Sequence, residues 1–288
     1  MSRESIVIVN GARTPVGRFQ GALASVPAHL LGAAAARAAL SRSGVRPEDI
    51  DEVVMGCIGQ VGADAYNARL VALAAGLPDR TPALTVNRLC GSGLQSIWSA
   101  AQQIAWGSAE TVLAGGDESM SRMPFLDFEA RGNSRLGNRT LIDGTIGILT
   151  DPFSNKHMGV TAERVAERYN VSREQQDEFA AESQRRAGTD AAKAAFAEEI
   201  TPVEVGGRKP FTVEVDEHPK PNTTIETLAG LRAAFVKDGT VTAGNASGLN
   251  DGAAMTLLMT AANAEKRGIE PLARIVSCKT ETCSVVRS

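Results

Sequence analysis

Short β-branched strands alternate with Ala- and Leu-rich helical segments along the first 120 residues of this 288-residue chain. This alternation predicts an α/β fold with parallel βαβ crossovers and helices on both faces of the sheet. A chain of this length has room for about two domains. The predicted strands are Ile6–Val9, Glu52–Cys57, Ala83–Val86 and Thr111–Ala114, and the predicted helices are His29–Ser41, Asn67–Ala75 and Gly91–Trp106.

The sequence changes character between Asp117 and about Asn250. Two charged helices are predicted over residues 160–169 and 173–198, with Glu182 and Arg186 one helical turn apart. The polar, proline-containing segment 200–223 predicts short strands and loops. We expect this part of the chain to be an insertion that lies over the strand ends, where ligands bind in α/β folds.

The sheet pattern resumes after this insertion. A buried strand is predicted over Ala253–Thr260, followed by a helix over Ala261–Arg267 and a strand that begins at Ala273–Val276. The last residues, Ser277–Ser288, show no hydrophobic periodicity and have the look of an out-of-frame tail or a truncation.

Composition argues against several classes of partner. Hydrophobic residues make up 43% and charged residues 22%, as in globular proteins. The net charge of −3 gives no reason to expect nucleic acid or an anionic membrane as a partner. No apolar run is long enough for a membrane span or a signal peptide. The four cysteines lack CxxC spacing and a neighbouring histidine, so we expect no metal site or disulfide framework and a cytoplasmic protein.

The most informative pattern is a strand that runs into Cys90, followed by Gly91, Gly93 and a helix. Such a turn places the sulfur at a helix amino terminus, where unpaired N–H groups and the helix dipole stabilise a thiolate. The glycines let a substrate carbonyl approach the backbone closely. The pattern predicts covalent catalysis by Cys90. The alternative is a packed core cysteine, because free cysteines are commonly buried.

Five motifs in order resemble the thiolases, the acetyl-CoA acetyltransferase family. The family's nucleophilic cysteine corresponds to Cys90. The resemblance extends from residue 5 to about residue 276. The motifs are Val9-Asn-Gly-Ala-Arg-Thr-Pro15, Asn87-Arg-Leu-Cys-Gly-Ser-Gly-Leu-Gln95, Gly115-Gly-Asp-Glu-Ser-Met-Ser121, His157-Met-Gly-Val-Thr-Ala-Glu163 and Thr242-Ala-Gly-Asn-Ala-Ser-Gly-Leu-Asn-Asp-Gly-Ala253.

The resemblance implies a layered thiolase-like α/β fold whose N-terminal half contains an inserted CoA-binding loop domain. Residues 1–120 and 251–270 would form the N-terminal domain and residues 121–250 the loop domain. Residues 271–288 would be the start of a truncated C-terminal domain. The family also implies a homo-oligomer, either a dimer or a tetramer.

The reaction and its substrates are likewise implied by the resemblance. An acyl group would move from CoA to Cys90, and a second acetyl-CoA would attack the acyl-enzyme to form acetoacetyl-CoA, or the reverse. Coenzyme A is then a substrate, with no permanently bound cofactor. The implied CoA contacts are His157, Met158, Lys220, Ala243 and Ser247. Lys220 stands where thiolases often carry Arg, and Met158 resembles the short-chain branch. From the residues alone, His157 would more often be a surface or satisfied histidine, and Lys220 could equally be a solvated lysine.

Three motifs of the second half of a thiolase have no counterpart. The only histidines are His29, His157 and His218, and none stands in a Gly-His-Pro motif. A Cys-x-Gly-Gly-Gly motif and an Asn-Glu-Ala-Phe motif are also absent. We therefore expect slow acylation of Cys90 with little complete turnover, and apolar surface on the helix Gly91–Trp106 that favours association. The alternatives are a non-catalytic acyl-CoA-binding fragment and a dinucleotide-binding protein, although the GxGxxG pattern is incomplete.

Overall fold

The chain forms two compact units in the computed structural model, which describes residues 4–132 and 136–278. The first unit contains residues 4–122, Phe196–Glu217 and residues 249–278. The second contains Met123–Ala195 and His218–Gly248, without the undescribed residues. Residues 196–217, which the sequence pattern assigns to the inserted domain, thus belong to the first unit.

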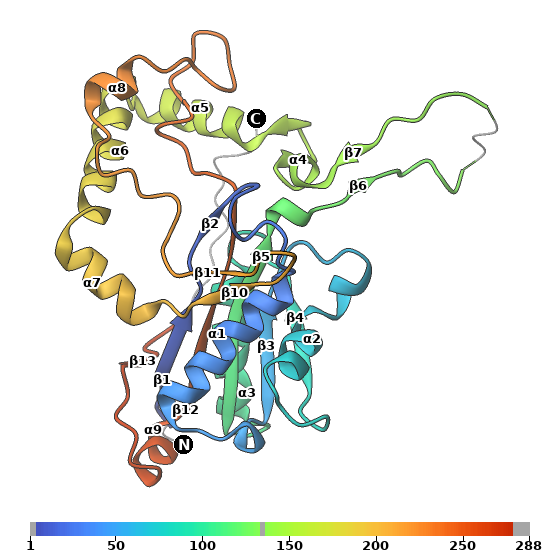
Figure 1. Ribbon diagram of the computed structural model, residues 1–288, viewed down its shortest axis with the longest axis vertical. Coiled ribbons are helices and arrows are strands. Elements are labelled where there is room, and N and C mark those ends of the chain that lie inside the picture. Colours follow the sequence, from blue (N-terminus) through green and yellow to red (C-terminus); the bar gives the residue numbers. More distant parts are fainter. Residues whose placement is uncertain (1–3, 133–135, 279–288) are drawn as a thin grey trace. The chain divides into compact units, whose positions relative to one another are not determined.

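A seven-stranded mixed sheet forms the centre of the first unit (Figure 1). Its strands are β1 (Ile6–Arg13), β2 (Gly17–Arg18), β3 (Glu52–Gly56), β4 (Ala83–Val86), β5 (Thr111–Ser119), β12 (Asn250–Thr260) and β13 (Ala273–Arg274). The order is β13-β1-β12-β5-β3-β4, and β2 pairs with β12. As the sequence predicts, β5, β3 and β4 are parallel, but β12 is antiparallel to both β1 and β5. The chain leaves β5 at Ser119 and returns at its partner Asp251, so β12 must run in the opposite direction.

Helices cover both faces of this sheet, as the alternating pattern predicts. The helices α1 (Ala28–Ser43) and α2 (Asn67–Ala74) pack on one face and α3 (Ser92–Trp106) on the other (Figure 1). Consecutive residues of β5 point to opposite faces, with Leu113 buried toward α1 and Val112 toward α3. This two-sided burial explains why the predicted strands are continuous apolar runs. The unit also contains α9 (Ala261–Lys266) and the short 3-10 helices η1 (Pro47–Asp49), η2 (Gly62–Tyr66) and η3 (Met120–Arg122).

The strand β5 continues well past its apolar run, which carries two acidic residues to the carboxyl edge of the sheet. The predicted strand ends at Ala114, yet Gly115 and Gly116 also pair with β12. A Cβ on Gly115 would collide with the carbonyl oxygen of Ala254, so a glycine is needed at this close approach. The extension places Asp117 and Glu118 opposite β12 and just beyond the end of β3.

Arg13 holds the segment 196–217 in the first unit. Its guanidinium donates to both carboxylate oxygens of Asp216, at 2.7 and 3.0 Å. The segment contains a hairpin of β10 (Val203–Val205) and β11 (Phe211–Val213), which confirms the short strands predicted for this part of the chain. Its Val203, Val205 and Val213 form a core cluster with Leu23, Val26 and Leu31.

Helices dominate the second unit. The helices α5 (Met158–Tyr169) and α6 (Arg173–Ala187) confirm the two charged helices, and Arg186 Nε donates to Glu182 at 2.7 Å. The second predicted helix was too long, because it ends at Ala187 and α7 (Asp190–Glu199) begins after an interruption. A Cβ on Gly188 would collide with Pro221, a contact that local sequence does not reveal. The remaining elements are β6 (Phe125–Leu126), β7 (Ile142–Asp143), α4 (Gly144–Ile148), β8 (Thr150–Asp151), β9 (Lys156–His157) and α8 (Ile225–Ala229).

The last predicted strand is part of the same sheet. The strand β13, expected to begin a further domain, is an edge strand that pairs with β1. Residues 279–288 of the aperiodic tail lie outside the described part of the chain. On α3, Leu94 is 77% and Trp106 89% exposed, so this chain leaves apolar surface on that helix uncovered, as expected. None of the described helices is long and apolar enough to cross a membrane.

Candidate active site

Cys90 lies in a tight turn between β4 and α3, at the edge of the sheet where the parallel strands end. Gly91 is the N-cap residue of α3, so Cys90 immediately precedes the cap. The amino end of a helix presents unpaired N–H groups and attracts negative charge. The side chain of Cys90 is exposed, so the interpretation as a packed core cysteine is wrong.

The turn before Cys90 has an uncommon backbone conformation. Leu89 has a φ of +48°, in the left-handed region that side chains with a Cβ seldom adopt. The turn is closed by the N–H of Gly91, which donates to the carbonyl of Arg88 at 3.1 Å. The N–H of Ser92 donates to the carbonyl of Leu89 at 2.9 Å. These bonds turn the chain from strand to helix within a few residues.

Two glycines of the sheet let the first turn of α3 lie against it. A Cβ on Gly56, the last residue of β3, would collide with the backbone carbonyl of Ser92 and lie 2.7 Å from the nitrogen of Gly93. A Cβ on Gly116 of β5 would lie 3.4 Å from the Cα of Gly93. The height of the Cys90 turn above the sheet is therefore fixed by backbone packed directly on backbone.

Two acidic residues of β5 lie at the same edge, Asp117 buried and Glu118 half-buried. Glu118 accepts the N–H groups of the two residues after Cys57, each at 3.0 Å, and lies 3.8 Å from the Cys57 sulfur. Burial raises the pKa of Glu118. Asp117 accepts a hydrogen bond from Asn67 Nδ2 at 2.7 Å, and burial raises its pKa to about 7. Both residues lie in the motif Gly115–Ser121, but the sequence gives no indication of their role.

Cys57, the last residue of the predicted strand Glu52–Cys57, directly follows β3 and is buried. Burial is the main cause that raises the pKa of its thiol, and the neighbouring Glu118 adds to the effect. A thiol in this environment stays protonated at neutral pH. Cys57 is therefore a packing residue, and Cys90 is the reachable cysteine at this edge of the sheet.

The five residues predicted to contact CoA all lie in the second unit. His157 is the N-cap residue of α5, and its Nδ1 accepts the N–H of Gly159 at 3.0 Å. Its ring stacks on Phe235, with the ring centroids 4.9 Å apart. Gly159 permits this arrangement because a Cβ there would collide with the Phe235 ring. His157 is thus held in one orientation, and the side chain of Met158 beside it is partly exposed.

Ala243 and Ser247 are exposed on a loop that Asn245 braces from within. Asn245 Nδ2 donates to Asp177 Oδ1 on α6 at 2.9 Å. Asp177 is buried and also accepts from Arg173 Nε at 2.7 Å. The loop therefore presents a small side chain and a hydroxyl to solvent from a fixed backbone.

Lys220 is exposed, and its backbone N–H donates to Gln184 Oε1 on α6 at 2.6 Å. Two residues earlier, the ring of His218 packs against the backbone of Gly248, where a Cβ would collide with it. Gly248 directly follows Ser247. The structure thus connects the Lys220 segment to the Ser247 loop through this contact.

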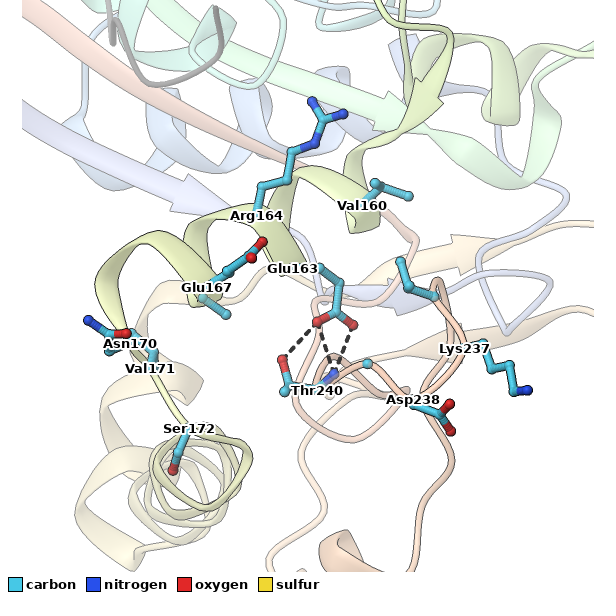
Figure 2. Close-up of a pocket in the computed structure, with 13 residues that line it drawn as sticks. Val160, Glu163, Arg164, Glu167, Asn170, Val171, Ser172, Lys237, Asp238 and Thr240 are labelled. Atoms are coloured by element: carbon cyan, nitrogen blue, oxygen red, sulfur yellow. Dashed lines mark hydrogen bonds between the residues drawn. The ribbon is translucent and has the colours of Figure 1, made fainter. Parts of the chain in front are cut away.

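A pocket of about 670 Å³ opens between α5 and residues 236–240 (Figure 2). On its wall, Glu163 accepts the N–H groups of Thr240 and Val241 and the Thr240 hydroxyl, at 2.8–3.0 Å. Although burial opposes it, these hydrogen bonds lower the pKa of Glu163. The lining includes none of the five residues predicted to contact CoA. Glu163 instead anchors the segment that leads into the loop of Ala243.

Comparison with known proteins decides the family. The family model described as thiolase, N-terminal domain, matches residues 6–262. The chain belongs to the thiolase family. This thiolase is 50% identical over 280 residues to a beta-ketothiolase of Cupriavidus necator, a match that covers 96% of this chain and 71% of the relative. It is 48% identical over 277 residues to an acetyl-CoA acetyltransferase of Pseudomonas aeruginosa, with 95% and 70% covered.

Solved structures agree with this assignment. The acetyl-CoA acetyltransferase of Bacillus anthracis matches this thiolase with a TM-score of 0.92 and 43% identity, over 95% of this chain and 70% of that one. Human mitochondrial 3-ketoacyl-CoA thiolase in complex with CoA matches with a TM-score of 0.88 and 44% identity. This match covers 94% of this chain and 68% of the human chain. These likenesses confirm the predicted thiolase-like α/β fold and place the chain in a family of acyltransferases.

Proposed function

We propose that this thiolase accepts an acyl group from acetyl-CoA or acetoacetyl-CoA on the sulfur of Cys90. The Cys90 thiolate attacks the thioester carbonyl, the bond between that carbonyl and the CoA sulfur breaks, and CoA leaves as a thiolate that takes up a proton. The observation that carries the proposal is the exposed sulfur of Cys90 at the amino end of α3. Helix N–H groups and dipole at that position favour the anion that attacks.

The second unit would supply the contacts to CoA. His157, fixed by Phe235, and the adjacent Met158 would contact the pantetheine arm together with the Ser247 hydroxyl. Ala243 would lie beside the nucleotide. Lys220 would face a phosphate as a point charge, which recognises phosphate with looser geometry than the planar fork of an arginine.

Condensation and thiolysis require a base and a second set of oxyanion donors. The three histidines of this sequence lie outside any Gly-His-Pro motif, and no cysteine is followed by Gly-Gly-Gly. The loss of a single oxyanion donor typically lowers the rate by about 10²–10³. We therefore propose that this 288-residue chain is acylated at Cys90 and that the acyl group then leaves slowly.

Mass spectrometry of the chain incubated with acetyl-CoA tests this function. We expect one acetyl group on the peptide that contains Cys90 and one equivalent of released CoA. Cys90→Ala should abolish both, whereas Cys278→Ala, which removes another exposed cysteine, should leave both unchanged. CoA binding without acylation would favour the alternative of a non-catalytic CoA-binding protein. Ordinary rates of acetoacetyl-CoA thiolysis would refute the missing-base argument.

A further inference from the structure

Ser92, the first residue of α3, joins two backbone groups of the Cys90 turn through its hydroxyl. Its Oγ accepts the N–H of Arg88 at 2.8 Å and donates to the carbonyl of Leu89 at 2.6 Å. The side chain is buried, so water does not compete readily for either bond. One hydroxyl therefore satisfies a donor and an acceptor on the two residues that precede Cys90.

The conformation of Leu89 needs such support. A leucine at φ +48° is unfavourable, because its Cβ crowds the backbone in the left-handed region. The side chain of Leu89 is 61% exposed, so packing does little to hold it there. Hydrogen bonds do so instead, with Asn87 Oδ1 accepting the Leu89 N–H at 3.0 Å and Ser92 bound to the other side of the residue.

Ser92 is also firmly anchored. Its backbone carbonyl lies so close to Gly56 that no Cβ would fit between them. The hydroxyl therefore extends to the turn from a backbone that the sheet holds in place. The sheet thus fixes the backbone of Ser92, and the Ser92 hydroxyl in turn fixes the Cys90 turn.

We propose that Ser92 is a positioning residue for Cys90: its hydroxyl keeps Leu89 in the left-handed conformation and thereby keeps the Cys90 sulfur exposed at the amino end of α3. The proposal rests on the proposed function of Cys90 as acyl acceptor. Ser92 acts through the turn and donates no proton to the substrate.

Ser96 provides a matched control in the same helix. It is fully buried, and its hydroxyl donates to the carbonyl of Gly93 at 2.7 Å. That bond is the ordinary contact of a helical serine with the preceding turn, and it does not involve the residues before Cys90. Ser92→Ala and Ser96→Ala therefore remove similar buried hydroxyls, and only the first releases the Cys90 turn.

The experiment compares the rate of iodoacetamide alkylation at Cys90 with that at the exposed Cys278 in the same molecule, by peptide mass spectrometry. Ser92→Ala should lower the Cys90-to-Cys278 ratio about tenfold and acetylation by acetyl-CoA about a hundredfold, since a misplacement of 1 Å costs a reaction about that much. Ser96→Ala should change both by less than about twofold. Thermal unfolding of the two variants should be similar.

A second substitution separates the role of the turn from general packing. Adding Leu89→Asn to Ser92→Ala should restore most of the lost reactivity, because asparagine adopts the left-handed conformation more readily. If Ser92→Ala does not fold, Asn87→Ala at its exposed position should still lower the ratio several-fold.

Equal Cys90-to-Cys278 ratios in Ser92→Ala and Ser96→Ala would overturn the proposal. The same holds if Asn87→Ala leaves the ratio unchanged. Failure of the proposed function looks different: acetyl-CoA would not acylate even the unsubstituted chain, while the alkylation ratio would still fall in Ser92→Ala.

Discussion

Gly56→Ala tests the backbone contact that lies beneath the Cys90 turn. The new Cβ would collide with the carbonyl of Ser92 and approach the nitrogen of Gly93 to 2.7 Å. Both neighbours are backbone atoms, which cannot rotate away as a flexible side chain can. Restoring an ordinary separation of about 3.5 Å requires the start of α3 to move outward by roughly 1 Å.

Overpacking of this kind typically costs about 1–3 kcal/mol of stability. We expect a loss near the upper end, about 3 kcal/mol in the free energy of unfolding, because the sheet and the helix backbone both resist the shift. Movement of the turn by about 1 Å should also slow acetylation of Cys90 about a hundredfold.

Gly93→Ala is the matched control on the facing element. Within the described part of the chain, no atom outside its own helix turn and chain neighbours lies within 4 Å of a Cβ placed at this residue. Alanine is favoured over glycine in a helix by up to about 1 kcal/mol, so this variant should gain about 0.5–1 kcal/mol. The two glycine-to-alanine changes, on neighbouring elements, should therefore change the free energy of unfolding in opposite directions.

Urea unfolding followed by tryptophan fluorescence measures both effects. The two tryptophans of the chain, Trp98 and Trp106, lie on α3, so the signal reports on the helix that must move. An unfolding free energy for Gly56→Ala within about 0.5 kcal/mol of the unsubstituted chain would refute the packing argument. Mass spectrometry of Cys90 acetylation provides the second readout.

Two further substitutions test acidic residues with shifted pKa values, the buried Asp117 and the half-buried Glu163. Burial raises the pKa of Asp117 to about 7. The unfolded state loses this proton near pH 4, so stability should fall as the pH rises from about 4 to 7. Asp117→Asn, which can still accept from Asn67, should remove that decline and gain up to about 4 kcal/mol at pH 8 in urea unfolding. Hydrogen bonds lower the pKa of Glu163. Its contribution to the free energy of unfolding is therefore present above about pH 4 and is lost as the pH falls. Glu163→Gln should lose about 1–2 kcal/mol at neutral pH and show faster hydrogen exchange at Thr240. These assignments would be contradicted if the difference in unfolding free energy between Asp117→Asn and the unsubstituted chain did not change with pH. Unchanged hydrogen exchange at Thr240 in Glu163→Gln would contradict them as well.

Local features were predictable from the sequence, and long-range ones were not. The strand Ala83–Val86 and the helix that follows Cys90 lie where the pattern placed them, because strand, turn and cap residues are neighbours in the chain. The reversed direction of β12 depends on where the insertion returns to the sheet. Gly188, at the end of α6, meets Pro221 more than thirty positions away, a contact that no local pattern reveals.

The same distinction holds within the candidate site. Cys90 was found from its own neighbours, since the two glycines and the helix start adjoin it. The role of Glu118 was not, because its partners follow Cys57, some sixty positions earlier. The hydrogen bonds of Ser92 are local in the chain. Their importance depends on the left-handed conformation of Leu89, which the sequence does not predict for a leucine.

The pairing of Ser119 with Asp251 has a consequence for how such a chain can diverge. Just beyond this pair, the Asp251 carboxylate accepts the N–H and the hydroxyl of Ser121, at 2.9 and 2.6 Å. The two ends of the excursion, at Ser119 and Asp251, are thus held side by side. The entropic cost of closing the chain between them grows only slowly with its length. The excursion can therefore be lengthened, shortened or rebuilt without changing the register of the strands that carry the Cys90 turn.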